Sequence, residues 1–289
     1  MSATKQSDNA NLDEYSITMT ADHKHHARAQ VVIDAIHPIT NMVYNPETKR
    51  VLSFQKDSGI IHAYSNKGVF AHTLTVGEKS DMKSNTEITK QHVTVHDLVN
   101  IPSINLIAIV CSDNTIYLYE EELTAGGIHR KYTLKNTIFQ HVLQSKSQIK
   151  LAWDPTSHIL YSTGQNDKIY LWDIETLKCK KIADGHRDMI MHMLVIKEKN
   201  FLATCSMDKS IILWGLENFT RKKTLLDHSH GVRKLAYADS ILVSVGFEYE
   251  AVVWDIVSKE KVRVCKTRSN VSAVSLTLFL TPSLLRSSP

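Results

Sequence analysis

The feature that most constrains the fold is a short repeated segment in which a turn residue precedes an alternating apolar run that ends in an aromatic residue. One copy is NDKIYLWDIETLKCKK (166–181), where the run ends in Trp172. The copies end in Tyr64, Tyr119, Trp172, Trp214 and Trp254. The three tryptophans are 42 and 40 residues apart, whereas the earlier aromatic residues are 55 and 53 residues apart. Recurrent spacings of this length indicate a repeat architecture, with loops inserted into the earlier copies.

Each copy lies within a longer unit of four short segments that are rich in β-branched and apolar residues and are separated by turn residues. In the fourth unit these segments are IMHMLVIKE (190–198), NFLATCSMDK (200–209), the run that ends at Trp214, and RKKTLLDHS (221–229). Four-stranded units of about 40–45 residues are typical of the blades of a β-propeller.

Over about residues 36–276 the sequence resembles the WD40-repeat β-propeller family. Trp172-Asp173 and Trp254-Asp255 match the Trp-Asp dipeptide of that family, and Gly185-His186 matches the Gly-His that opens a repeat. The resemblance implies an all-β fold, a WD40-type β-propeller. We expect about five four-stranded antiparallel blades plus the start of a sixth, in an incomplete ring. The expected divisions are a disordered polar tail (1–28), the propeller blades (29–276) and a C-terminal tail (277–289).

In the family pattern, an opening His, a strand Ser or Thr, a turn Asp and the strand Trp form a hydrogen-bonded chain. The fourth unit carries His186, Asp208 and Trp214, with either Thr204 or Ser206 as the hydroxyl residue. The chemistry is sound, because a buried indole N–H needs an acceptor and a turn Asp accepts hydrogen bonds from its own loop.

The other units depart from this pattern. The third has no His at the matching position, the fifth has Glu248 at the Asp position, and the first two have Tyr in place of Trp. The residues that we assign to the repeat framework are Asp57, Tyr64, Asp113, Tyr119, Asp167, Trp172, Asp173, His186, Asp208, Trp214, His228, Trp254 and Asp255.

The composition indicates a globular protein of a reducing compartment. The 289 residues are 43% hydrophobic and 22% charged, ordinary values for a chain that buries its own core. No run approaches the roughly 18 apolar residues of a membrane helix, and the polar N-terminus shows no secretory signal. Cys111 and Cys205 lie in apolar strands and no CxxC pair is present, as expected for reduced thiols. We therefore expect a cytoplasmic location and no membrane partner.

Residues that could suggest catalysis or metal binding are better explained by structure. Asp113, Asp167 and Asp208 recur once per unit, which catalysis does not require. The sequence has no P-loop, GxGxxG, GxSxG, HExxH or EF-hand motif. The cluster HKHH (23–26) lacks a fourth ligand at ordinary zinc spacing, so a solvated tail is favoured over a metal site. We predict no catalytic residue, cofactor or metal.

Two basic clusters fall on fourth strands or the turns that lead into them. They are Lys178, Lys180 and Lys181, and Arg221, Lys222 and Lys223. Charged edge strands resist pairing between sheets, and this interpretation is favoured. A nucleic-acid partner is not expected, because the net charge is only +4 and aromatic residues are not interleaved with the basic ones.

The favoured function is a non-catalytic scaffold that binds other proteins through its propeller loops. The alternative is an enzyme or small-ligand sensor that uses the central funnel. Cullin-ligase adaptors of the family have Arg two residues after Trp-Asp, and here those positions hold Glu175 and Val257. The phrase GFEYEA (246–251) is either a contact surface or a drifted turn. The same phrase is similar to long WD40 chains of cilia and flagella, which makes a ciliary or cytoskeletal location an alternative.

The ends of the repeat region raise the question of closure. RAQVVIDAI (28–36) is predicted to be a strand before the first blade, placed to pair with a last blade. NVSAVSL (270–276) begins as a first strand should, without a turn Asp or aromatic residue after it. The apolar flanks Val31–Ile33 and Val271–Leu276 would then seek β-pairing, so self-association through unpaired edge blades is expected.

Overall fold

The structure is a computed structural model of the chain. It describes residues 15–22, 28–35, 39, 41–45, 48–55, 58–65, 67, 69–76, 93–123, 130–139, 150–163 and 167–266. The chain divides into two compact units, unit 1 (Met1–Leu151) and unit 2 (Ala152–Pro289). No helix among the described residues is long and apolar enough to cross a membrane.

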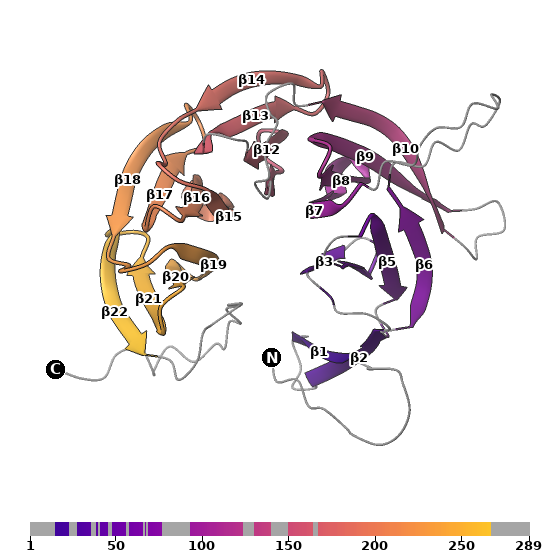
Figure 1. Cartoon of the computed structure of the whole chain (residues 1–289), viewed down its shortest axis with the longest axis horizontal. Coiled ribbons are helices and arrows are strands. Elements are labelled where there is room, and N and C mark those ends of the chain that lie inside the picture. The colour runs from indigo at the N-terminus through magenta and orange to yellow at the C-terminus, as the bar shows by residue number, and fades with distance from the viewer. Residues whose placement is uncertain are drawn as a thin grey trace. The chain divides into compact units, whose positions relative to one another are not determined.

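In unit 1 the described strands form a two-stranded ribbon and two four-stranded antiparallel sheets, blade 1 and blade 2 (Figure 1). The ribbon consists of β1 (Tyr15–Asp22) and β2 (Arg28–Ala35). Blade 1 consists of β3 (Asn41–Asn45), β4 (Arg50–Phe54), β5 (Ile60–Ser65) and β6 (Phe70–Thr75). Blade 2 consists of β7 (Val95–Ile101), β8 (Leu106–Cys111), β9 (Thr115–Leu123) and β10 (Arg130–Phe139).

In unit 2 the described strands form three further four-stranded antiparallel sheets, blades 3 to 5. Blade 3 consists of β11 (Leu151–Asp154), β12 (Ile159–Thr163), β13 (Ile169–Asp173) and β14 (Lys178–Ala183). Blade 4 consists of β15 (Ile190–Ile196), β16 (Phe201–Ser206), β17 (Ser210–Gly215) and β18 (Thr220–Leu226). Blade 5 consists of β19 (Val232–Ala238), β20 (Ile241–Gly246), β21 (Glu250–Asp255) and β22 (Glu260–Lys266).

The prediction of an all-β, WD40-type propeller with five four-stranded antiparallel blades is confirmed. Within each blade, every strand pairs with the next one in the chain, so the fourth strand is an edge. We call β6, β10, β14, β18 and β22 the outer strands. The predicted start of a sixth blade and the C-terminal tail (277–289) lie outside the described residues.

The ribbon differs from the expected N-terminal tail. β1 lies within residues 1–28, and its residues YSITMTAD alternate in the manner of a strand and are rich in β-formers. It pairs antiparallel with β2, from Tyr15 opposite Ala35 to Asp22 opposite Arg28. β2 is the strand predicted over residues 28–36, but its partner is β1, whereas pairing with a last blade was predicted.

The hydrophobic cores lie between neighbouring blades. One core in unit 2 packs Tyr161 and Leu171 of blade 3 against Leu202 and Trp214 of blade 4. A second core joins blades 4 and 5 and includes Trp254. In unit 1, blades 1 and 2 share a core in the same way. Because a blade buries its faces only against its neighbours, its stability depends on stacking.

An aromatic stack links blades 3 and 4. Phe219 lies in the turn between β17 and β18, is 4% exposed and has φ 47°. Its ring stacks on Trp214, with centroids 5.3 Å apart, and on Tyr161, with centroids 5.4 Å apart. Lys181 Nζ of blade 3 donates to the carbonyl oxygens of Asn218, at 2.7 Å, and Phe219, at 3.3 Å. The turn of one blade is therefore fixed to the preceding blade by both packing and hydrogen bonds.

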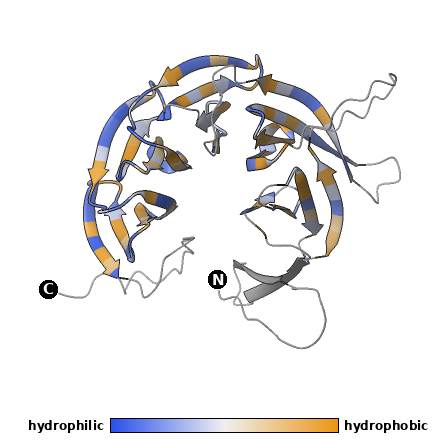
Figure 2. Ribbon diagram, in the orientation of Figure 1, coloured by the Kyte–Doolittle hydropathy of each residue, from blue (hydrophilic) through white to orange (hydrophobic). Residues whose placement is uncertain are grey.

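Each outer strand carries a β-bulge next to the repeat aromatic residue. The pairing register shifts by one residue at this place in all five blades. The extra residues are Ala71, Lys135, Lys180, Lys222 and Val262. Bulges and lysines both hinder the pairing of an edge strand with a further strand. Figure 2 shows hydrophilic residues recurring along β14, β18 and β22, which supports the edge-strand interpretation of the basic clusters.

The aromatic stack gives a stability prediction. Phe219→Ala should lower the free energy of unfolding by about 3–5 kcal/mol, because the substitution leaves a cavity between Trp214 and Tyr161. Urea denaturation followed by tryptophan fluorescence measures the change. The matched control is Lys223→Ala on β18, which is exposed and should change the stability by less than about 0.5 kcal/mol. Equal losses in the two variants would contradict the role assigned to the stack.

Candidate functional site

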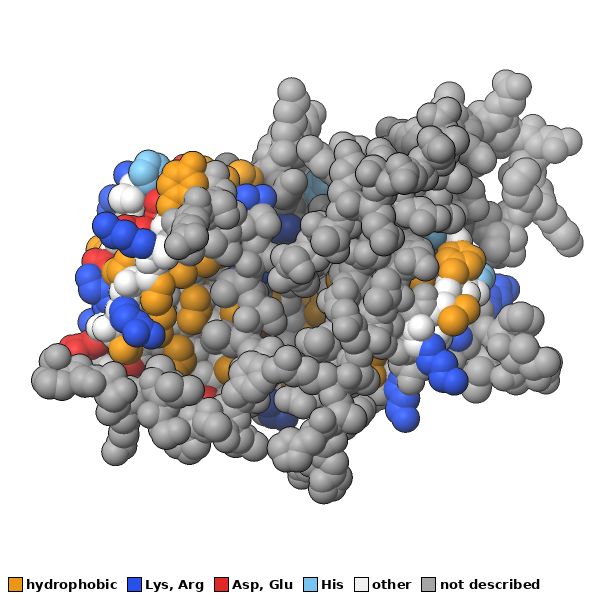
Figure 3. All heavy atoms as spheres, turned by 90° about the horizontal axis from the view of Figure 1, so that it is seen from below, with side chains coloured by type: hydrophobic (Ala, Val, Ile, Leu, Met, Phe, Trp, Pro, Cys, Tyr) orange, Lys and Arg blue, Asp and Glu red, His pale blue; other side chains and the backbone are white. Residues whose placement is uncertain are grey.

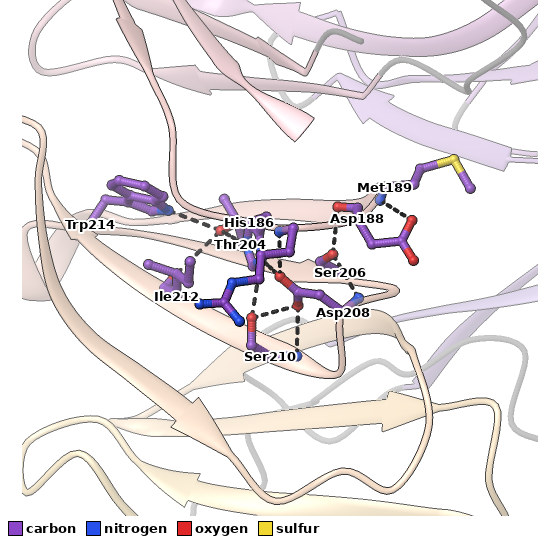
Figure 4. A network of polar contacts seen from close by, with 10 residues as sticks. His186, Asp188, Met189, Thr204, Ser206, Asp208, Ser210, Ile212 and Trp214 are labelled. Carbon is purple, nitrogen blue, oxygen red and sulfur yellow. Dashed lines mark hydrogen bonds and ion pairs between the residues drawn. The ribbon is translucent and has the colours of Figure 1, made fainter. Parts of the chain in front are cut away.

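Blade 4 contains a continuous chain of side-chain hydrogen bonds, which we call the blade 4 tetrad (Figure 4). Trp214 Nε1 donates to Thr204 Oγ1 at 2.9 Å. Thr204 Oγ1 lies 2.8 Å from His186 Nε2, and His186 Nδ1 lies 2.9 Å from Asp208 Oδ2. Because a carboxylate only accepts, Nδ1 carries the proton and donates to Asp208. The tetrad joins β16, β17, the turn between them and the loop before β15.

Of the two candidate hydroxyl residues, Thr204 belongs to the tetrad and Ser206 does not. Ser206 Oγ donates to the Asp188 carbonyl oxygen at 2.7 Å and accepts from the Asp208 backbone N–H at 3.0 Å. Ser206 therefore ties the β16–β17 turn to the loop before β15 by a second route.

The Asp208 carboxylate is fully engaged. Oδ1 accepts from Ser210 N at 2.9 Å and from Ser210 Oγ at 2.6 Å, and Oδ2 accepts from Arg187 N at 2.9 Å as well as from His186. Burial by itself raises the pKa of Asp208. The hydrogen bonds outweigh burial and hold the pKa well below its ordinary value of 3.8, so the group is an anion at neutral pH.

Gly185 explains the Gly-His dipeptide that opens the repeat. A Cβ at this position would lie 2.6 Å from the Trp214 indole, so only a residue without a side chain lets the backbone pass. The close approach places the next residue, His186, within reach of Thr204 and Asp208.

Blade 5 builds the same tetrad with a glutamate. Trp254 Nε1 donates to Ser244 Oγ at 2.8 Å, Ser244 Oγ lies 2.6 Å from His228 Nε2, and His228 Nδ1 bonds to Glu248 Oε1. In the sequence, Glu248 departs from the repeat pattern, which has Asp at this position. In the structure, Glu248 nevertheless completes the tetrad with the other three residues. Gly246 makes the longer side chain possible, since a Cβ there would lie 2.4 Å from Glu248 Oε2. The paired changes to glycine and glutamate were the signal in the sequence.

Blade 3 retains part of the pattern. Trp172 Nε1 donates to Ser162 Oγ at 2.9 Å, ten residues back, as in blades 4 and 5. Asp167 does not occupy the turn position of Asp208. Its φ of 59° matches that of Lys209, at 71°, which is one residue further along the turn. Counting back from the tryptophan places Asn166 at the Asp208 position, and Asn166 lies outside the described residues.

In blades 1 and 2 both members of the hydrogen-bonded pair are replaced, the tryptophan and the Ser or Thr ten residues before it. Tyr64 and Tyr119 are 5% and 3% exposed, and the residues ten positions before them are Phe54 and Ile109. Tyr has no indole N–H at this depth, so the facing position no longer needs a hydroxyl. The sequence identified the aromatic positions and missed this coupled change.

The turn residues of blades 1 and 2 also differ from blade 4. Asp113 Oδ1 accepts from Thr115 N at 3.0 Å, and Oδ2 accepts from the Tyr117 hydroxyl at 2.6 Å. In blade 1, Asp57 lies outside the described residues. Ser58 Oγ accepts from Ile60 N at 3.0 Å, the bond that Asp113 makes in blade 2, and Ser58 is six residues before Tyr64.

The Asp of each Trp-Asp dipeptide caps the following hairpin turn. Asp173 Oδ1 accepts from Glu175 N and Thr176 N, both at 2.9 Å, and Oδ2 is 2.6 Å from Lys180 Nζ. Asp255 Oδ1 accepts from Val257 N at 2.7 Å and from Ser258 N at 3.3 Å. Backbone donors in the turn are thereby satisfied, which is a structural task.

The tetrads therefore use their acids and imidazoles to hold turns and loops in place. Among the described residues, no group of three His, Cys, Asp or Glu side chains is placed to hold a metal ion. The side chains that the β20–β21 turn presents to solvent are Phe247, 43% exposed, and Tyr249, 57% exposed. Glu248 between them is buried in its tetrad, so GFEYEA is a turn with an exposed aromatic pair.

The fold and the repeated tetrads define a WD40-type β-propeller. The family model described as "WD domain, G-beta repeat" matches residues 133–173 and 177–215. The second match contains the complete blade 4 tetrad. The chain carries WD40 repeats over these residues.

Several curated proteins are similar to this chain. Cilia- and flagella-associated protein 337 B of Tetrahymena thermophila is 22% identical over 227 residues, 74% of this chain and 18% of that protein. DDB1- and CUL4-associated factor 10 of Homo sapiens is 28% identical over 109 residues, 36% of this chain and 19% of that protein. Nuclear distribution protein PAC1 of Candida albicans is 28% identical over 166 residues, 53% of this chain and 32% of that protein. The chain thus spans a third or less of each of these relatives.

The hydroxyl of Thr204 can be tested without changing the shape of the core. Thr204→Val should lower the free energy of unfolding by about 1–3 kcal/mol, because the buried Trp214 N–H loses its acceptor. The control is the same chemical change at an exposed site, Thr220→Val, which should stay within about 0.5 kcal/mol. Equilibrium urea denaturation gives both values, and a Thr204→Val variant as stable as the control would argue against the tetrad.

The depressed pKa of Asp208 gives a pH prediction. The ionised carboxylate stabilises the fold above its unfolded pKa, about 3.9, and this contribution is lost as the pH falls through and below that value. Stability of the unaltered chain should therefore fall more steeply from about pH 5 to pH 2 than that of Asp208→Asn. The variant should be less stable at pH 7. Denaturation midpoints at a series of pH values, with exposed Asp239→Asn as control, measure the difference; identical slopes for the chain and Asp208→Asn would refute it.

Proposed function

We propose that this chain is a non-catalytic scaffold that binds other proteins through the loops and turns of its propeller blades. The observation that carries the proposal is the use of His186, Asp208, His228 and Glu248 in buried hydrogen bonds within the framework. A group that is already committed to holding a turn is not free to act as an acid, base or nucleophile. WD40-repeat proteins are generally scaffolds of this kind.

The same framework favours binding over catalysis because it makes the loops rigid. In blade 4 the tetrad and Ser206 connect the β16–β17 turn to the loop before β15 at several points. Backbone bonds from Met207 N to Met189 O, at 2.9 Å, and from Phe247 N to Gly231 O, at 3.0 Å, repeat this connection in blades 4 and 5. Loops that do not reorder on contact lose little conformational entropy when a partner binds.

The relatives support a location in the cytoplasm or on the cytoskeleton. One is named for cilia and flagella and another for nuclear distribution. We propose a cytoplasmic location, with the cilium or cytoskeleton as the more specific alternative. The association with DDB1 and CUL4 in the name of the third relative is not carried over. The positions where cullin-ligase adaptors of the family have Arg hold Glu175 and Val257, both exposed on blades 3 and 5.

Self-association is a further part of the proposal. β22 is the edge strand of blade 5, and its Val262 and Val264, which alternate with Lys261 and Arg263, are 57% and 36% exposed. Figure 3 shows hydrophobic side chains among Lys and Arg side chains on the described surface. An exposed apolar edge strand can pair with a strand of a second copy of the chain, and the basic residues and bulge of β22 limit the extent of that pairing.

Cross-linking mass spectrometry on complexes purified from the source cell tests the scaffold. We expect partner proteins whose cross-links lie on the loop side of the blades, including Lys209, and whose recovery falls in a loop variant such as Arg187→Glu with an unchanged melting temperature. The alternative of an enzyme or ligand sensor in the funnel predicts something different. It would be supported by turnover or small-molecule binding that one substitution abolishes, with no protein partner recovered.

A further inference from the structure

We propose that the turn between β20 and β21 is a binding site for a basic side chain, arginine or lysine, of a protein partner. We call this site the blade 5 turn and define it as Gly246–Glu250. The inference rests on the proposed scaffold function and specifies one contact and its chemistry. Three features carry it: a buried carboxylate oxygen without a donor, two exposed aromatic rings, and a closely related turn in blade 4 that lacks both.

The carboxylate of Glu248 is only half satisfied. Its side chain is 7% exposed, and Oε1 bonds to His228 in the tetrad. The second oxygen, Oε2, is buried and has no hydrogen-bond partner among the described residues. His230 Nδ1 lies 3.9 Å from Oε2, beyond hydrogen-bond distance, and the His230 side chain is 65% exposed. A buried carboxylate oxygen without a donor is costly, and a cation that reaches it removes that cost.

Because His230 is exposed and its Nδ1 lies 3.9 Å from the buried Oε2, we place the approach of the ligand on the side of this ring. His230 belongs to the loop before β19, next to the blade 5 turn, and Ser229 Oγ lies 2.9 Å from its Nδ1. A side chain that enters beside His230 meets the carboxylate without displacing His228 from the tetrad.

Blade 4 provides a comparison within the same chain. Its turn, SMDKS (206–210), occupies the positions of GFEYE in blade 5, because both precede a tetrad tryptophan by the same number of residues. In blade 4, Ser206 and Ser210 bring hydroxyls to the turn, and Asp208 has donors on both oxygens. In blade 5 the two serines are Gly246 and Glu250. The Ser210 hydroxyl, which donates to the Asp208 carboxylate in blade 4, is thereby lost at the corresponding position, and a second acid takes its place.

The residues that flank the carboxylate also differ between blades 4 and 5 in a way that favours a cation in blade 5. Met207 and exposed Lys209 of blade 4 correspond to Phe247 and Tyr249 of blade 5. A cation of the turn is thus replaced by an aromatic ring, and both rings are exposed, Phe247 at 43% and Tyr249 at 57%. Aromatic faces next to an acid attract a cation more strongly than either group alone.

Phe247 already binds a guanidinium within the chain. Arg233 is the bulged residue of β19, and its Cζ lies 5.4 Å from the centre of the Phe247 ring. The Arg233 guanidinium lies over this ring, and Glu248 Oε2 has no hydrogen-bond donor among the described residues. Tyr249, the more exposed ring, is then the face open to a ligand.

These features select the ligand class. A planar guanidinium can donate to a carboxylate oxygen and stack on an aromatic ring at the same time, and an ammonium can do so with less geometric fit. An anion is disfavoured by Glu248 and Glu250. A bare metal ion is disfavoured because the described residues include no group of three ligating side chains.

The test uses two peptides that differ in one side chain, arginine or its neutral analogue of similar shape, citrulline. Acetyl-Gly-Ser-Arg-Ser-Gly-amide and the same peptide with citrulline in place of arginine are titrated into the full chain, and backbone amide resonances are followed by NMR. We expect saturable shifts of the amides from Gly246 to Glu250 with the arginine peptide. Binding of the citrulline peptide should be at least about tenfold weaker, because a hydrogen bond to a charged group is lost. A lysine peptide should fall between the two.

Two variants locate the binding. Glu248→Gln keeps an acceptor for His228 but removes the charge, and it should weaken arginine-peptide binding by about the same tenfold factor. The second variant carries the blade 4 turn, G246S/F247M/E248D/Y249K/E250S, whose tetrad the chain already builds once. It should fold and lose binding. Since this turn is known to close a tetrad, it remains informative if Glu248→Gln fails to fold.

The outcomes are distinguishable from those of the scaffold test. Equal binding of the two peptides, unchanged binding by either variant, shifts elsewhere than the blade 5 turn, or no shifts at all would each overturn this site. The scaffold proposal would stand in every one of those cases if cross-linked partners are recovered. Shifts of these amides on dilution without peptide would instead identify a second copy of the chain as the occupant, which also overturns the proposal.

Discussion

The indole N–H of the repeat tryptophan is the group on which the framework depends. Burying a large aromatic side chain between blades supplies much of the stacking energy, but the buried N–H must find an acceptor. Trp172, Trp214 and Trp254 find it in a Ser or Thr hydroxyl ten residues earlier, across the neighbouring strand. In blades 4 and 5 the hydroxyl in turn meets an imidazole, and the imidazole meets a carboxylate in the turn. Where the tryptophan is absent, at Tyr64 and Tyr119, the hydroxyl is absent as well.

The blades were predicted well from the sequence because two independent signals mark the repeat. They are the spacing of the aromatic residues and the alternation of apolar and polar residues along each strand. The ribbon strand β1 carried only the alternation, because it lies in a polar N-terminal segment outside the repeat and has no place in the aromatic spacing. The framework residues were predicted less well where we relied on the type of amino acid and not on its distance along the chain from the repeat aromatic residue. Asp167 has the expected identity in the wrong position of its turn, whereas Ser58 has an unexpected identity in the right one. Counting residues back from the aromatic residue would have corrected both.

Glu248 illustrates what a single position cannot reveal. Its side chain is longer than that of Asp208 by one methylene, so it fits only because Gly246 has no side chain to occupy the same space. A Cβ at residue 246 would crowd the Glu248 carboxylate, so the two changes suit each other. The price of this solution is a carboxylate oxygen without a donor, at the same place where the chain presents two aromatic rings. The unsatisfied carboxylate oxygen and the exposed aromatic rings thus lie in the same turn.

The family repeat and the blade are offset from each other, and the offset defines what folds together. The match over residues 177–215 begins with outer strand β14 of blade 3 and ends with β17 of blade 4. It contains His186, which lies on the connection between the two blades, together with the other three residues of the blade 4 tetrad. The tetrad therefore fixes the connection between two blades to the second of them, within one continuous segment of the chain. Insertions between repeats lengthen loops without opening a tetrad, whereas an exchange of whole blades would cut through every one of these closed segments.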